Sequence, residues 1–105
     1  MEKVFVEYAI AEEARNEYLA FMSGILGGLA SGAGVLKPEW YEGTDQPGLF
    51  VEVWPGMNYA DFLKWKERRT NCGDAEWGRF DRWVRGGLQK LHIWHFSVPA
   101  LEPRS

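Results

Sequence analysis

Apolar and polar residues alternate in four stretches of the chain, and a period of two is typical of β-strands. The expected strands are residues 3–10, 35–42, 49–54 and 88–98. In the first of them, Val4 and Val6 fall on one face while Phe5 and Glu7 fall on the other. Pro38 cannot donate a hydrogen bond to a neighbouring strand, so we expect the second strand at an edge of the sheet or with a bulge.

Between these strands, apolar residues recur at spacings of three and four, which predicts helices. The expected helices are residues 11–26, residues 58–70 and a short helix that begins with Asp74 as its cap. Glycines from Gly24 onward disfavour a longer first helix. Asn58 is expected to cap the second helix, because its side chain can accept a hydrogen bond from the first turn.

The order of these elements predicts a ferredoxin-like α+β fold, formed by a single domain over residues 1–105. In this split β-α-β arrangement, four antiparallel strands lie in the order 4-1-3-2 and the helices pack on one face. Residues 5–8 and 50–53 read FVEY and FVEV, which suggests two equivalent β-α halves. We therefore expect the first and third strands to be neighbours that present their glutamates in the same phase.

Two helices cover only one face of a four-stranded sheet, and the other face must be solvated or buried elsewhere. With Leu49, Val51 and Val53 assigned to the helix side, the open face is expected to carry five aromatic residues and four polar ones. These are Phe5, Phe50, Trp54, Trp94 and Phe96, with Glu7, Glu52, Lys90 and His92. A monomer would not leave so many aromatic side chains in water. This predicts a homodimer in which two copies pack face to face across a two-fold axis and enclose a space.

Composition and charge exclude several classes of protein. Hydrophobic residues make up 46% of the chain and aromatic residues 15%, so a disordered chain is excluded. A net charge of −3 gives no basic field for a nucleic acid. Cys72 is the only cysteine, which excludes an intrachain disulfide and fits a reducing cytoplasm. No apolar run approaches the roughly 20 residues that cross a bilayer, so we expect a cytoplasmic protein without a membrane partner.

In its element order, its length, its aromatic open face and the Trp77-x-x-Phe80 pattern before the last strand, the chain resembles the dimeric α+β-barrel superfamily. This superfamily includes cofactor-free antibiotic-biosynthesis monooxygenase-like proteins, NIPSNAP-like proteins and several small isomerases, and the resemblance covers residues 3–98. Its cofactor-free monooxygenases draw on an Asn, Trp and His set, and its haem-degrading members use a helix histidine. Here Glu7 replaces the Asn and neither histidine is expected on a helix, so the resemblance favours neither activity, although Trp65 is a candidate for the tryptophan.

Glu7, Glu52 and His92 are the strongest candidates for catalysis, because the predicted strand order lets all three face one cavity. Carboxylates among aromatic side chains lose hydration, which raises their pKa toward values useful for acid–base chemistry. A neighbouring histidine can share or relay the proton. The alternative is that both glutamates form structural ion pairs with Lys90, with arginines or with a partner chain, because an unpaired buried charge is costly.

Metal and nucleotide sites are not expected. His92 and His95 are three residues apart on a predicted strand, so they point to opposite faces, and Cys72 is the only thiol. The glycines between Gly24 and Gly34 match neither a dinucleotide-binding motif nor a P-loop. We therefore expect neither a metal nor a cofactor.

Three functions fit these expectations. In the first, the protein binds a small apolar or aromatic molecule between sheet and helices. The side chains expected to contact it are Phe5, Phe50, Trp54, Trp65, Trp94 and Phe96. In the second, the protein is a monooxygenase or isomerase without cofactor, in which one glutamate is the base and His92 its partner. In the third, it is a structural module whose aromatic residues serve only dimerisation.

Overall fold

The computed structural model describes residues 2–30 and 37–100 of the 105-residue chain. Its strands are β1 (Lys3–Ala9), β2 (Glu39–Glu42), β3 (Leu49–Pro55) and β4 (His92–Phe96). Its helices are α1 (Arg15–Ala30), α2 (Tyr59–Arg69) and α3 (Phe80–Trp83), with 3-10 turns η1 (Glu12–Ala14) and η2 (Leu88–Lys90). All strand pairs are antiparallel and the order is β2-β3-β1-β4, so the predicted ferredoxin-like α+β fold is confirmed.

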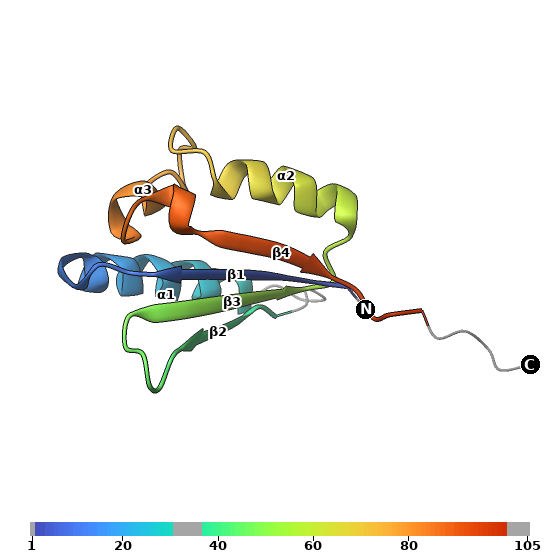
Figure 1. Ribbon diagram of the computed structural model, residues 1–105, viewed down its shortest axis with the longest axis horizontal. Helices are drawn as coiled ribbons and strands as arrows, with labels where there is room; N and C mark the ends of the chain where they lie inside the picture. Colours follow the sequence, from blue (N-terminus) through green and yellow to red (C-terminus); the bar gives the residue numbers. More distant parts are fainter. Residues whose placement is uncertain (1, 31–36, 101–105) are drawn as a thin grey trace, which may run out of the picture.

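The helices leave one face of the sheet uncovered. In Figure 1, β1 and β3 pass in front of α1, and α2 lies beside the β4 edge. On the helix side, Val4, Val6 and Tyr8 of β1 are buried in a core that includes Tyr18 and Met22 of α1. Burial of each such side chain stabilises the fold by roughly 1.5–3 kcal/mol, which holds the helix layer against the sheet.

The first helix is longer than the sequence predicts. The glycines were expected to end it near residue 26, but α1 continues through Gly24 to Ala30. A glycine inside a helix costs only about 0.5–1 kcal/mol relative to alanine. The buried side chains of Tyr18 and Met22 on the same helix outweigh that cost.

The second and fourth strands are shorter than predicted. The strand expected at residues 35–42 begins at Glu39, and residues 35 and 36 lie outside the described part of the chain. It is an edge strand, as Pro38 predicted, and this proline precedes the first paired residue. Lys90 belongs to η2 and not to β4, so its predicted place in the last strand is wrong.

One of the two predicted helix caps is present: Asn58 caps α2, whereas Asp74 caps a turn and not α3, whose N-cap position is Arg79. The side chain of Asn58 accepts a hydrogen bond from the backbone N–H of Asp61 at 2.8 Å. Asp74 accepts from the backbone N–H groups of Glu76 and Trp77 at 3.1 Å and 2.8 Å. The segment after Asp74 consists of turns, however, and regular helix begins only at Phe80.

The phase of β3 is opposite to the predicted one. Val6 lies opposite Glu52 in the β1–β3 pair, and Glu7 lies opposite Val51. Residues opposite one another in an antiparallel pair share a face of the sheet. Phe50, Glu52 and Trp54 therefore point toward the helices, and Leu49, Val51 and Val53 point to the open face. The repeated FVE phrase marks neighbouring strands, as predicted, but its two glutamates lie on opposite faces.

Candidate functional site

A buried ion pair lies between the sheet and α2. Glu52 is 1% exposed and Arg69 is 0% exposed. Arg69 donates through Nη1 and Nη2 to the two carboxylate oxygens of Glu52, at 2.7 Å and 2.8 Å. The indole N–H of Trp54 donates to the same carboxylate at 2.8 Å, and the hydroxyl of Tyr8 donates to its Oε2. Four donors thus satisfy a charge that would be prohibitive to bury alone.

Two tyrosines extend this network toward β2. The hydroxyl oxygens of Tyr8 and Tyr18 are 2.7 Å apart, and Trp40 donates its indole N–H to Tyr18 at 2.8 Å. Burial, followed by the charge of Glu52, raises the pKa of Tyr8 well above its usual value, and burial also raises the pKa of Tyr18. Both phenols therefore stay protonated and act as hydrogen-bond donors at physiological pH.

Arg69 is also enclosed by aromatic rings. Its guanidinium carbon lies 4.1 Å from the ring centroid of Trp77, 4.8 Å from that of Phe80 and 5.1 Å from that of Trp65. Burial alone would lower the pKa of Arg69, but the charge and hydrogen bonds of Glu52 raise it, so the guanidinium is charged. This arrangement is the structural ion pair that the sequence offered as the alternative for Glu52.

A cavity of about 430 Å³ lies next to this ion pair, between α1 and α2. We call it the tryptophan pocket; it is lined by Gly24, Ile25, Gly28, Trp54, Trp65, Arg68, Glu76 and Trp77. Trp65 meets Trp54 and Trp77 edge to face, with ring centroids 5.1 Å and 5.0 Å apart. The volume of the tryptophan pocket lies within the range of about 300–1,000 Å³ that is usual for small-molecule sites.

The rim of the tryptophan pocket carries one arginine that is paired with two carboxylates. Arg68 Nε lies 3.1 Å from Asp74 Oδ1, and Arg68 Nη2 lies 3.6 Å from Glu76 Oε1. The hydrogen bond from the backbone N–H of Trp77 and the one from Arg68 lower the pKa of Asp74, which is ionised at neutral pH. Among the described residues that line the pocket, the only cation, Arg68, is therefore already paired.

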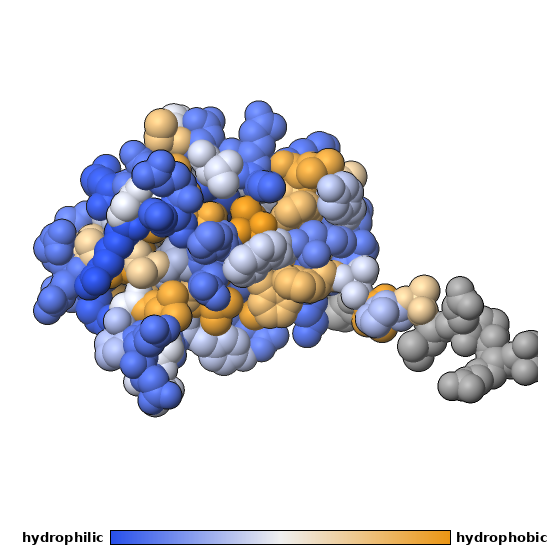
Figure 2. Space-filling model, viewed as in Figure 1, coloured by the Kyte–Doolittle hydropathy of each residue, from blue (hydrophilic) through white to orange (hydrophobic). Residues whose placement is uncertain are grey.

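The open face of the sheet holds a second cavity. We define the open sheet face by the outward residues Phe5, Glu7, Val51, Val53, His92, Trp94 and Phe96. A groove of about 390 Å³ is lined by five of them: Phe5, Glu7, Val51, Trp94 and Phe96. Figure 2 shows hydrophobic side chains gathered along the strands on this side of the molecule, between hydrophilic margins.

Glu7 and His92 are brought together on the open sheet face, as predicted. They are direct partners in the β1–β4 pair. The ring of His92 stacks on that of Trp94, with centroids 5.5 Å apart and an interplanar angle of 5°. Glu52 is not part of this group, so the prediction that all three candidates face one space is wrong. The reason is the register of β3, which turns Glu52 toward Arg69.

The predicted aromatic contacts divide between two places. Phe5, Trp94 and Phe96 lie on the open sheet face, as expected. Trp54 was expected there too, but it joins Trp65 in the tryptophan pocket. Phe50 was also assigned to the open face, and this is wrong. It is 2% exposed in the helix-side core, where its ring lies 4.6 Å from that of Tyr18.

Sequence reasoning missed Arg69 as the partner of Glu52 and the glycines of α1 as pocket walls. A signal for the arginine exists, because Arg69 falls on the inward stripe of α2 defined by Phe62. His95 lies on the helix side of β4, as expected, with Nε2 3.0 Å from the carbonyl oxygen of Met57. The same nitrogen lies 3.3 Å from Glu2 Oε1, and His95 lines neither cavity described above.

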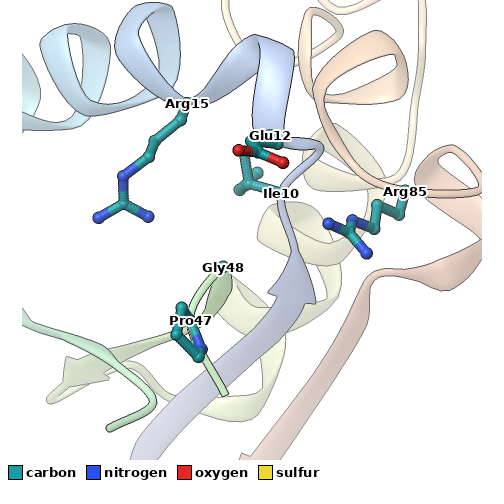
Figure 3. Close-up of a pocket in the computed structure, with 6 residues that line it drawn as sticks. All are labelled: Ile10, Glu12, Arg15, Pro47, Gly48 and Arg85. Carbon is teal, nitrogen blue, oxygen red and sulfur yellow. The ribbon is translucent and has the colours of Figure 1, made fainter. Parts of the chain in front are cut away.

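A third cavity, of about 350 Å³, lies at the end of the sheet where the β2–β3 turn meets the start of α1. Figure 3 shows its lining residues, with Arg15 and Arg85 on either side of Ile10 and Glu12. Arg15 donates to both carboxylate oxygens of Glu42, at 2.6 Å and 2.7 Å. This contact, followed by a hydrogen bond from the Gly48 N–H, lowers the pKa of Glu42 to about 2. The pair ties α1 to the turn.

Two further observations bear on ligands and surroundings. Within residues 2–30 and 37–100, no group of three histidine, cysteine, aspartate or glutamate side chains is arranged to hold a metal ion. Among the helices in that same part, none is long and apolar enough to cross a membrane.

Several solved structures have the same fold as this chain. A structure titled antibiotic biosynthesis monooxygenase aligns with a TM-score of 0.64 at 19% identity, covering 95% of this chain and 100% of that one. A Deinococcus radiodurans structure titled "putative antibiotic biosynthesis monooxygenase" aligns with a TM-score of 0.67 at 14% identity, covering 100% of this chain and 99% of that one. An uncharacterised NIPSNAP domain protein from Burkholderia xenovorans aligns at 0.53 and 18% identity, covering 99% and 100%.

Comparison of the sequence alone adds no closer relative: no family model and no curated protein matches it. The structural likeness extends over almost the whole chain in each case, while the identities stay below 20%. The chain therefore has the ferredoxin-like α+β fold that antibiotic biosynthesis monooxygenase-like and NIPSNAP proteins share.

Proposed function

We propose that this protein binds a small apolar or aromatic molecule in the tryptophan pocket. The observation that carries this proposal is a cavity of about 430 Å³ whose walls include three tryptophans held in fixed mutual contact. The Glu52–Arg69 pair anchors two of these walls, because Trp54 donates to Glu52 and Trp77 stacks on Arg69. Rigid aromatic surfaces lose little conformational entropy on binding and give a ligand a large contact area.

The proposal also includes a homodimer formed through the open sheet face. Trp94 and Phe96 are 43% and 51% exposed there, and both line an apolar groove. A second copy packed across a two-fold axis would remove these side chains from water and close the groove. A cytoplasmic location is part of the same proposal, because Cys72 is exposed as a free thiol.

Light scattering after gel filtration tests the dimer. We expect a mass of about 24 kDa, twice the 12.1 kDa of the chain. Trp94→Glu should yield the monomer, because a charge would have to be buried between the two sheets. Leu63→Glu is the matched control, since Leu63 is 49% exposed on α2, away from the open sheet face. A monomer of unaltered sequence at micromolar concentration, or equal effects of both substitutions, would exclude this dimer.

Calorimetric titration with 2-naphthol tests the site. Trp65→Leu removes a pocket wall and should weaken binding about tenfold, the value of one well-placed aromatic contact. Trp94→Leu removes an aromatic of similar size from the open sheet face and should leave binding within about twofold. The reverse result would move the ligand to the groove on the open sheet face. If 2-naphthol does not bind and both leucine variants stay dimeric, the structural module becomes the better account.

One observation favours an enzymatic alternative on the open sheet face. Glu7 lines the groove there and lies directly opposite His92 in the antiparallel β1–β4 pair. In a cofactor-independent oxygenase or isomerase, Glu7 would be the base and His92 its partner, and the dimer would exclude water from the reaction. Glu52 has no such role in this alternative, because four donors hold its carboxylate on the other side of the sheet. Loss of turnover in Glu7→Gln with an intact dimer would support it.

A further inference from the structure

Gly24 has no structural reason to be glycine. It lies inside α1, where glycine costs about 0.5–1 kcal/mol relative to alanine. A Cβ built on Gly24 meets no atom within 4 Å, so close packing does not exclude a side chain. Its φ is not in the left-handed region, since the positive-φ glycines are Gly48, Gly56, Gly86 and Gly87. The fold would gain from a larger residue here, while the cavity would lose space.

That space belongs to the tryptophan pocket. Gly24, Ile25 and Gly28 form its α1 wall, and Trp54, Trp65 and Trp77 line the same cavity from β3, α2 and the following turns. At Gly24 and Gly28, one helical turn apart, this wall has no side chain, so the cavity reaches the helix backbone there. The volume of about 430 Å³ is nearly three times the roughly 150 Å³ of a cavity that holds benzene.

The polar groups of the pocket indicate the charge of its occupant. Arg68 is paired with Asp74 and Glu76, so an anionic ligand would have to compete with two carboxylates. The indole N–H groups of Trp65 and Trp77 are buried and have no acceptor among the described residues. An uncharged ligand would leave the paired charges of the rim undisturbed.

We propose that Gly24 determines the specificity of the tryptophan pocket by keeping open a slot for an uncharged, planar ring system. The inference rests on the function proposed above and adds the shape and charge of the ligand. In this arrangement the ring lies between the α1 backbone at Gly24 and the tryptophan walls. A puckered ring of the same carbon skeleton is too thick for the slot, and an anion is repelled by the carboxylates at the rim.

Three probes and two matched variants test this inference by calorimetry at neutral pH. The probes are 2-naphthol, its saturated analogue decahydro-2-naphthol and the anion 2-naphthoate. We expect 2-naphthol to bind about tenfold more tightly than either of the others. Gly24→Leu should weaken 2-naphthol binding at least tenfold. Gly27→Leu should leave it within about twofold, because Gly27 is exposed on the same helix, also has open space at its Cβ, and does not line the pocket.

The controls separate failure of this inference from failure of the proposed function. Circular dichroism should show both leucine variants folded, since each replaces a helical glycine with a better helix former. If Gly24→Leu does not fold, Gly24→Ala should still weaken 2-naphthol binding about threefold. If decahydro-2-naphthol bound as tightly as 2-naphthol, or if the Gly24 and Gly27 variants had equal effects, the role proposed for Gly24 would be overturned. The proposal that the tryptophan pocket binds a ligand would still stand. Absence of binding by all three probes would overturn both proposals.

Discussion

Replacement of Arg69 by methionine should be among the most destabilising single changes in this protein. The guanidinium is 0% exposed and donates to both oxygens of Glu52. Methionine keeps an apolar chain of similar length against Trp77 and Phe80, so the change creates little empty space. It leaves the carboxylate of Glu52 buried with no cation, however, and the loss of one partner from a buried pair costs about 3–5 kcal/mol.

That loss is large on the scale of the whole molecule. Domains of this size have free energies of unfolding of about 5–15 kcal/mol, so Arg69→Met should remove about a fifth or more of the total. Arg68→Met is the matched control, because Arg68 is the preceding residue of α2 and its side chain is 50% exposed in its pair with Asp74. An exposed ion pair contributes at most about 1 kcal/mol, so the control should lose little.

Urea unfolding followed by circular dichroism measures these differences. A double-mutant cycle adds the decisive comparison, because Glu52→Gln removes the charge that Arg69→Met leaves unpaired. The double variant should be more stable than the sum of the two single losses predicts, by about 1–3 kcal/mol. If Arg69→Met loses no more than Arg68→Met, or if the two single losses add within about 0.5 kcal/mol, the buried pair does not anchor the pocket walls as described.

Three smaller perturbations follow from contacts outside the ion pair. Arg15 lowers the pKa of Glu42 from 4.5 to about 2, so the contribution of this ion pair to stability is complete above pH 4.5 and is lost as the pH falls toward 2. The difference in the free energy of unfolding between the unaltered protein and Glu42→Gln, measured by urea unfolding, should therefore shrink over that range. A difference that grew as the pH fell would refute the pairing. Asn58→Ala removes the acceptor for the Asp61 N–H and should cost about 1 kcal/mol, whereas an unchanged urea midpoint would show that the cap contributes nothing. Gly56→Ala forces a residue with φ of 79° to carry a Cβ and should cost about 1 kcal/mol, seen as a fall in melting temperature of about 4–8 °C; an unchanged melting temperature would contradict this.

The order of elements could be predicted because each long segment has one clear period. β1 alternates strictly between buried and half-buried residues, and α2 carries its apolar residues on one stripe. The phase of β3 could not be predicted in the same way, because both of its faces are apolar or aromatic. Leu49, Val51 and Val53 on one side and Phe50 and Trp54 on the other suit either environment. The observed β1–β3 register turns Glu52 toward Arg69, its ion-pair partner. That partner lies on α2, so the pattern of β3 alone does not reveal it.

The candidate site was harder to predict than the fold for a related reason. Part of the wall of the tryptophan pocket is Gly24, which has no side chain. In a sequence, such a glycine indicates the end of a helix and not the wall of a pocket. Packing of Tyr18 and Met22 carries α1 past that glycine. Trp65 was predicted as a ligand contact and lines the pocket, while its neighbour Trp54 was assigned to the wrong face because the phase of β3 was wrong.

Isotope-filtered nuclear Overhauser spectra of the protein with 2-naphthol would test the central claim most directly, because they report which protons lie next to the ligand. We predict contacts from the naphthol ring to the indole protons of Trp54 and Trp65 and to the Hα protons of Gly24. Contacts to Phe5 and Trp94 on the open sheet face, with none to the two pocket tryptophans, would contradict the claim that this protein binds its ligand between α1 and α2.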